Sequence, residues 1–115
     1  MSPENAHSAV VDAVLGPRGS APLHARRVAL RHGMAVARGE REAELDGLGP
    51  EAAALVDTVA RHAYRTTDEA IDAACAAGRS DDEVFDLVVA AALGAGLARR
   101  EIGLSAVDRW EAGRT

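Results

Sequence analysis

The chain has 115 residues, a formal net charge of −5 and 48% hydrophobic residues, which suits one packed domain. Alanine supplies 26 of the hydrophobic residues, whereas only Tyr64, Phe85 and Trp110 are aromatic. Alanine favours helices, and β-sheets favour the branched and aromatic side chains that are scarce here, so an all-β fold is excluded. The negative charge disfavours nucleic acid and anionic membranes as partners.

Cysteine content and hydropathy limit the cellular location that we expect for the protein. The single cysteine, Cys75, excludes an intramolecular disulfide and a four-cysteine zinc site. The first residues lack the basic and apolar pattern of a secretory signal. The longest apolar run, residues 84–98, contains Asp86 and is shorter than the ~20 residues that span a bilayer. We therefore expect a cytoplasmic protein without membrane contact.

The first half of the chain predicts two helices. Apolar residues recur at helical spacing over residues 6–15, and again from residue 21 or 22 to about residue 38. Glycine and proline in residues 16–20 separate the two. Residues 39–50 are charged and contain several glycines, so we expect a connection there.

The next two helices carry clear start and stop signals. Pro50 suits a helix start, because its missing N–H costs nothing there. Thr66 and Glu69 fit a capping box that opens a short helix, which Gly78 ends. The expected inward residues of these two helices are Leu55, Val56, Val59, Ala60, Ala63, Ile71, Ala74 and Cys75.

A second capping box, Ser80 with Glu83, predicts a helix over residues 81–98. Gly94-Ala95-Gly96 within it indicates either a close approach of another backbone or a kink. A final amphipathic helix is expected at residues 99–111, with Ile102, Leu104, Val107 and Trp110 on its apolar side. The sequence therefore predicts one all-α domain of five or six helices over residues 1–115.

Charged segments and histidines give few functional signals. Residues 17–38 hold five arginines and no acid, which indicates a solvated face paired with Glu40, Glu42 and Glu44, or a surface for an acidic partner. A helix-turn-helix at residues 74–86 is excluded as a DNA reader, because carboxylates lead its second helix. His7, His24, His32 and His62 lack the i, i+4 spacing of helical zinc ligands, so no metal is expected.

One polar cluster combines groups that could carry chemistry. Its members are Glu51, Thr58, His62, Tyr64, Arg65 and Asp68. Residues 51, 58 and 62 fall near one helical face, because eleven residues make about three turns. A carboxylate, an imidazole, a phenol and a guanidinium could transfer protons or bind an anionic group. The alternative is a polar helix edge with ordinary surface hydrogen bonds.

Residues 74–84, followed by the alanine- and valine-rich residues 87–92, resemble the carboxymuconolactone decarboxylase and alkylhydroperoxidase D superfamily. Residues 59–68 are most similar to a small bacterial subgroup of that superfamily. The resemblance covers residues 50–112 and implies an alkylhydroperoxidase D-like core that assembles into dimers, trimers or hexamers. Residues 1–49 would then supply additional N-terminal helices.

The resemblance also bears on chemistry. The redox members carry a Cys-x-x-Cys-x-x-x-His motif, whose positions fall here on Ala63, Thr66 and Ala70. Without those thiols the peroxidase cycle is excluded. The superfamily's upstream glutamate falls near Glu51. Its decarboxylase branch works without metals or organic cofactors, so none is expected here.

Two main hypotheses follow. In the first, the protein is a cofactor-free proton-transfer enzyme of lyase or isomerase type, or a binder of a small organic acid. His62 would act as acid or base, Glu51 would orient it and Tyr64 would donate, while Arg65, Asp68 and Thr58 would bind the ligand. In the second, the protein is a non-catalytic helical assembly or protein-interaction module. A third reading is a redox protein that uses Cys75.

Overall fold

The computed structural model describes residues 3–17, 19–40, 45 and 47–114, and within them it is all-helical with no strand. The predicted all-α class is therefore confirmed. Its elements in chain order are α1 (Pro3–Val14), α2 (Leu23–Arg38), α3 (Pro50–His62), the 3₁₀ turn η1 (Ala63–Arg65), α4 (Asp68–Ala76) and α5 (Asp81–Ala112).

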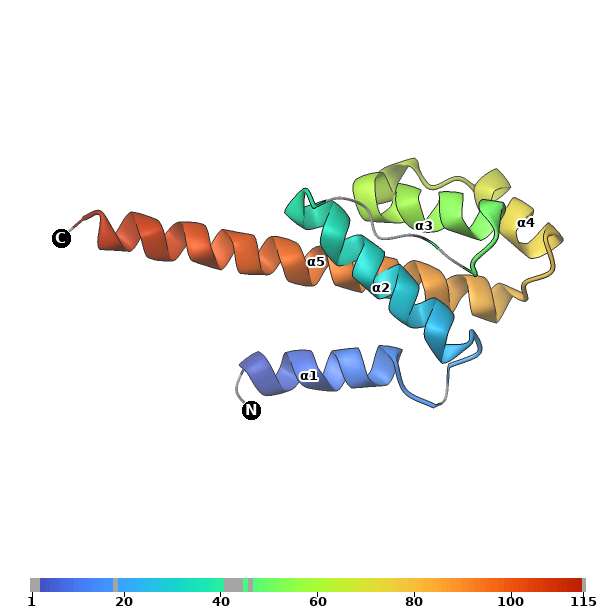
Figure 1. The fold of residues 1–115 in the computed structure, drawn as a ribbon, viewed down its shortest axis with the longest axis horizontal. Helices are drawn as coiled ribbons and strands as arrows, with labels where there is room; N and C mark the ends of the chain where they lie inside the picture. Colours follow the sequence, from blue (N-terminus) through green and yellow to red (C-terminus); the bar gives the residue numbers. More distant parts are fainter. Residues whose placement is uncertain (1–2, 18, 41–44, 46, 115) are drawn as a thin grey trace.

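The core lies where α2 and α3 pack against the first half of α5 (Figure 1). Its buried side chains are small or branched, as the composition predicts, and include Ala29, Leu30, Leu55, Val56, Val59, Leu87 and Ala91. The crossing of α2 and α5 depends on two glycines. A Cβ at Gly33 would meet the carbonyl oxygen of Ala91, and a Cβ at Gly94 would meet that of Leu30. The close approach expected at residues 94–96 is therefore confirmed at Gly94.

The predicted break between residues 98 and 99 is wrong, because α5 runs as one helix from Asp81 to Ala112. Residues 99–101 are Arg-Arg-Glu, which are good helix formers, so nothing in the sequence stops the helix there. Gly96 and Gly103 lower the helix propensity but do not end it. The expected final helix is instead the second half of α5.

Most predicted helix ends are confirmed. Pro50 occupies the first turn of α3, and the Oγ of Ser80 accepts a hydrogen bond from the backbone N–H of Glu83 at 3.2 Å. Gly78, just after α4, has a φ of 111°, a backbone conformation that favours glycine.

Two details of this region differ from the prediction. The cap of α4 is Thr67, not Thr66, and its Oγ1 accepts from the backbone N–H of Ala70 at 3.1 Å. The capping box is incomplete because Ala70, the third residue of the helix, has no side chain that could bond to the backbone N–H of Thr67. Ala63, which the sequence predicts to face inward, is exposed. The helix α3 ends at His62, so Ala63 does not continue its apolar face.

Three arginines fasten loops and helix ends to the core. Arg26 is buried and donates to the carbonyl oxygens of Val14, Gly16 and Ala21 at 2.9, 2.5 and 2.9 Å. Arg79 donates to the carbonyl oxygens of Gly47 and Leu48, and Arg99 donates to that of Ala60 at 2.9 Å. Each arginine satisfies backbone acceptors that a helix end or a loop leaves unpaired.

The arginine-rich segment is thus only in part the solvated face that the sequence suggests. Arg26 is 4% exposed, whereas Arg27 and Arg31 are exposed. Arg38 pairs with Glu101 of α5 at 2.8 Å. Arg18 and two expected partners, Glu42 and Glu44, lie outside the described residues.

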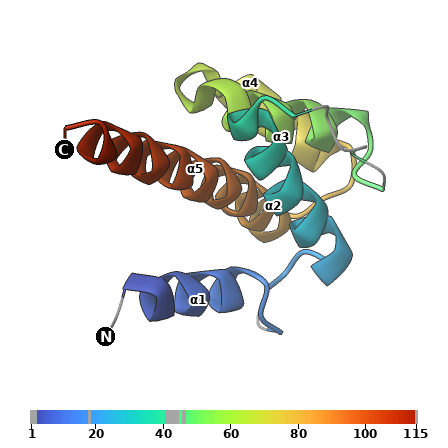
Figure 2. The same ribbon diagram turned by 60° about the vertical axis from the view of Figure 1, so that its left-hand side comes forward.

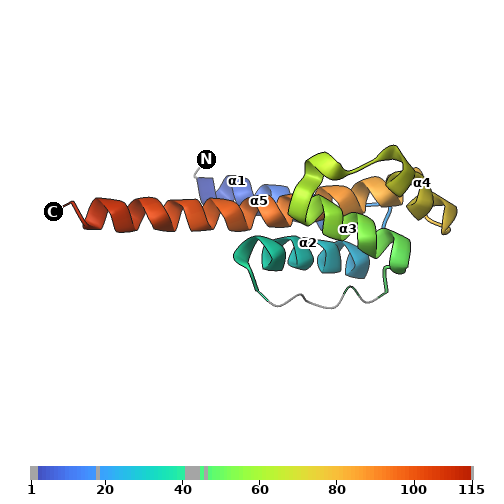
Figure 3. The same cartoon turned by 90° about the horizontal axis from the view of Figure 1, so that it is seen from above.

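The molecule is elongated because two elements lie beside or beyond the core. α1 lies on the opposite side of α5 from α3 and α4 (Figures 1 and 2). The second half of α5 extends past every other helix (Figures 1 and 3). The principal extents are 57 × 28 × 23 Å, and the radius of gyration is 15.5 Å, against about 13 Å for a compact domain of this length.

Within the described residues, no helix, α5 included, combines the length and the apolar character that crossing a bilayer requires.

Candidate functional site

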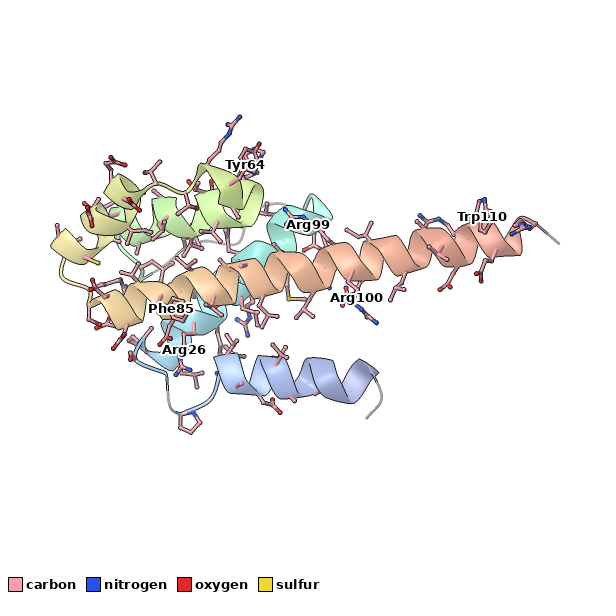
Figure 4. All side chains as sticks on the ribbon, turned by 180° about the vertical axis from the view of Figure 1, so that it is seen from behind. Arg26, Tyr64, Phe85, Arg99, Arg100 and Trp110 are labelled. Atoms are coloured by element: carbon pink, nitrogen blue, oxygen red, sulfur yellow. The ribbon has the colours of Figure 1, made fainter. Side chains whose placement is uncertain are left out.

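Three of the six predicted site residues lie together where α3 passes into η1. The rings of His62 and Tyr64 pack edge to face with centroids 5.7 Å apart, and the guanidinium of Arg65 lies 5.8 Å from the Tyr64 centroid. This group is open to solvent: Tyr64 is 79% exposed, and its side chain points away from the fold (Figure 4).

Two other members lie elsewhere on α3. Glu51 and Thr58 line a hollow of about 320 Å³ between α3 and α4. The hydroxyl of Thr58 donates to the carbonyl oxygen of Ala54 at 3.0 Å, an ordinary intrahelical bond. Glu51 and His62 are separated by three turns, about 16 Å along the helix axis. Sequence spacing predicts that the two residues share one face of α3, but it does not bring them to the same position along the helix axis.

Asp68, the sixth member, is exposed at the start of α4. Its carboxylate suits that position, because the N-terminal end of a helix favours negative charge. The structure therefore divides the predicted cluster: Glu51 and Thr58 line the hollow beside α4, His62, Tyr64 and Arg65 lie at the end of α3, and Asp68 begins α4.

Three further hollows lie on the described surface. One of about 450 Å³ separates α1 from α5 and is lined by Val10, Ala13, Phe85 and Val89, among others. A second, of about 380 Å³, lies between α4 and α5 on the other side of Phe85, which is 65% exposed (Figure 4). A polar hollow of about 440 Å³ includes Glu51, Arg79 and Glu83. None of the four hollows is lined by His62, Tyr64 or Arg65.

A continuous uncovered stretch of helix is the second half of α5, residues 99–112, which we call the α5 tail. Ala98 is the last buried residue of α5, and every residue of the tail is exposed. Its large apolar side chains are Ile102, Leu104, Val107 and Trp110, which are 46, 48, 50 and 60% exposed. The tail reaches about 21 Å beyond the core.

Two residues at the root of the tail bind other helices. Arg99 and Glu101 bind Ala60 of α3 and Arg38 of α2, respectively. Near the end of the tail, the Arg114 guanidinium lies 4.5 Å from the Trp110 ring centroid. A helix of this size without tertiary packing is marginal in water, so its apolar side chains gain from a partner.

A buried polar group was not singled out from the sequence. His32 is buried, and its Nε2 lies 2.8 Å from Oδ1 of Asp57, which also accepts from Arg61. The other ring nitrogen, Nδ1, is buried and has no hydrogen-bond partner among the described residues. The spacing of His32 with Ala25 and Ala29, both buried, is the signal that could have placed it inward. Its contacts link α2 to α3.

Cys75 faces inward, as predicted, and packs partly buried against the core with Ile71. Its Sγ donates to Oδ1 of Asp81 at 3.2 Å. This hydrogen bond, partial burial and the negative charge of Asp81 raise the pKa of the Cys75 thiol. A thiol with a raised pKa is a poor nucleophile at neutral pH, which does not suit redox chemistry.

No His, Cys, Asp and Glu side chains of the described residues form a group of three that could hold a metal ion. Comparison of the chain with protein-family models, curated proteins and solved structures finds no match, so the alkylhydroperoxidase D-like core stays a prediction from the sequence.

Proposed function

We propose that this protein is a non-catalytic helical assembly module whose copies associate through the α5 tail. The observation that supports the proposal is the tail itself: a helix that leaves the core after Ala98 with four large apolar side chains about half exposed. Monomeric soluble proteins rarely leave such a continuous apolar surface uncovered, and surfaces of this kind mark interaction sites.

The shape of the protein favours this proposal over the catalytic one. A catalytic site needs His62, Tyr64 and Glu51 to meet around one substrate, in a pocket that excludes water. In the structure, His62 and Tyr64 are exposed to solvent, and Glu51 lines a hollow at a different part of α3. The described residues do not gather these three side chains around one site for the small organic acid expected from the sequence.

The expected association is concentration-dependent. A stable interface buries about 800 Å² on each partner. The area that one face of a four-turn helix can bury lies at the lower end of the sizes of stable interfaces. The tail carries Arg99, Arg100 and Arg109 beside Glu101, Asp108 and Glu111, so its formal charges balance and two tails do not repel strongly. We expect monomers and oligomers in exchange.

Analytical ultracentrifugation of the full chain over a wide concentration range tests the proposal. The wild type should shift from monomer to oligomer, and the double variant Leu104→Glu, Val107→Glu should stay monomeric with unchanged helicity by circular dichroism. The matched control is Val10→Glu, Leu23→Glu, which charges two exposed apolar side chains outside the tail. A wild type that is monomeric at every concentration, or a tail variant that associates like the control, would overturn the proposal.

A further inference from the structure

The side chains of the α5 tail fall on lines that suit a second helix. Residues 100, 104, 107 and 111 follow one another at intervals of four, three and four, which places them along one side of the helix. Residues 99, 103, 106 and 110 form the neighbouring line with the same intervals. Figure 4 shows Arg99 and Trp110 on one side of the tail and Arg100 on the other. Leu104 and Val107 lie on the first line and Trp110 on the second, while Ile102 lies beyond the second line.

Charge on the first line distinguishes the two possible directions of pairing. Arg100 lies at one end and Glu111 at the other, with Leu104 and Val107 between them, and all four are exposed. Two parallel tails would place Arg100 beside Arg100 and Glu111 beside Glu111. Two antiparallel tails place Arg100 beside Glu111 of the second copy, and two-fold symmetry repeats the pair.

The same charges set the register, and that register matches the fold. If Arg100 of one copy faces Glu111 of the other, then residue 99 faces residue 112 and the two tails overlap along their whole uncovered length. The last buried residue of α5, Ala98, lies just outside this overlap. The two cores then lie at opposite ends of the pair, because the tail of each copy extends past the other helices of that copy (Figure 1).

Side-chain size on the second line agrees with this register. Trp110, the largest side chain of the tail, lies level with residue 101 of the second copy, about half a turn from Arg99 and from Gly103 on the neighbouring line. Among the described residues, no atom outside the local helix lies within 4 Å of the position that a Cβ on Gly103 would occupy, so there is space for the indole. Arg99 does not compete for it, because its guanidinium is held on the carbonyl oxygen of Ala60.

We infer that the partner of the α5 tail is the same segment of a second copy, bound antiparallel with Arg100 of each copy beside Glu111 of the other. This inference rests on the proposed self-association and adds the number of copies, the direction and the register. The assembly is an isologous dimer with its two-fold axis beside residues 105 and 106.

Disulfide trapping tests direction and register. Two proteins, Arg100→Cys and Glu111→Cys, are prepared in a Cys75→Ser background, which retains a hydroxyl donor beside Asp81. Under mild oxidation, an equimolar mixture should form a disulfide-linked dimer of one copy of each, and neither protein alone should form one efficiently. Crosslinking of each protein with itself would show parallel pairing and overturn the inference. A mixture that ultracentrifugation shows to be dimeric, but that does not crosslink, would overturn the register and leave self-association standing.

Charge reversal gives an independent readout. Arg100→Glu and Glu111→Arg should each weaken the dimer roughly tenfold, because each converts two attractive pairs into two repulsive ones. The double variant restores both pairs and should return to the dissociation constant of the wild type. Equal weakening in the double variant would overturn the inference. If the wild type never associates, the proposed function fails with it.

Discussion

Gly94 of α5 lies so close to α2 that a Cβ on it would stand 2.0 Å from the carbonyl oxygen of Leu30. The obstacle is backbone, which cannot turn aside as a flexible side chain can. Gly33 of α2 has the reciprocal relationship with Ala91 of α5, at 2.2 Å. The two glycines therefore set the distance between the two helices that make up most of the core.

Gly94→Ala should destabilise the fold although alanine is the better helix former. The gain in helix propensity is about 1 kcal/mol, whereas forcing α2 and α5 apart costs about 3 kcal/mol or more across a close-packed core. Urea unfolding should show a net loss of about 2 kcal/mol. Gly96→Ala is the matched control, since nothing lies within 4 Å of its Cβ position, and it should stabilise by up to about 1 kcal/mol. Equal effects at both positions would contradict the tight crossing.

Arg26 is the residue through which the end of α1 and the loop after it are held. Its guanidinium donates to three backbone carbonyl oxygens, and only 4% of the residue is exposed. Arg26→Met keeps the apolar stem but removes every donor, leaving carbonyl groups without partners at about 1–3 kcal/mol each where water cannot reach them.

We expect Arg26→Met to release α1 before the rest of the fold unfolds. Hydrogen exchange should accelerate over residues 8–15 while α3 stays protected. Arg27→Met, at the exposed neighbouring position, should leave both patterns unchanged. Equal protection of α1 in the two variants would show that Arg26 does not hold it.

Local sequence signals predicted the helices well, and tertiary relationships poorly. Proline at a helix start, serine as a cap and glycine after a helix act within a few residues, and Pro50, Ser80 and Gly78 behave as expected. The sequence does not predict the continuation of α5 beyond Ala98. The side chains that are covered change at this point, and in the sequence that change resembles the start of a new helix.

The candidate site shows the same limit. Helical spacing gives the angle of a residue around the axis, and by that measure Glu51, Thr58 and His62 agree. Helical spacing does not show which neighbouring helix covers that face at each position along the axis. α4 lies beside Glu51 and Thr58, while the end of α3 at His62 is open to solvent. Distance along the helix, rather than angle, separates the predicted acid and base from their partner.

The contact between His32 and Asp57 should contribute to stability through the link between α2 and α3. His32 is buried, so removal of its only described hydrogen-bond partner leaves a polar ring nitrogen unpaired in the core. Asp57→Ala should therefore cost about 1–3 kcal/mol in the free energy of unfolding. Asp72→Ala, an exposed carboxylate on α4, is the control and should change it by less than about 0.5 kcal/mol. Similar losses in the two variants would indicate that the contact is not stabilising.

Cys75 should react slowly with thiol reagents in the folded protein. The thiolate is the reacting form, and the hydrogen bond to Asp81, partial burial and the negative charge of Asp81 raise the pKa of the thiol, so less thiolate is present near pH 8 than in a free cysteine. The rate of alkylation, measured against pH, should therefore rise at higher pH than in the urea-unfolded chain.

Replacement of the carboxylate separates its effect from that of burial. Asp81→Asn removes the negative charge beside Sγ, which lowers the pKa of Cys75 and should move the alkylation profile towards lower pH. Asp82→Asn removes a carboxylate from the same first turn of α5 without removing the acceptor of the thiol, and should leave the profile in place. If both variants gave the wild-type profile, the carboxylate of Asp81 would not control the thiol, and burial and the charge of Asp72 would remain as causes. A folded protein that reacted as fast as the unfolded chain would instead return Cys75 to consideration as a redox residue.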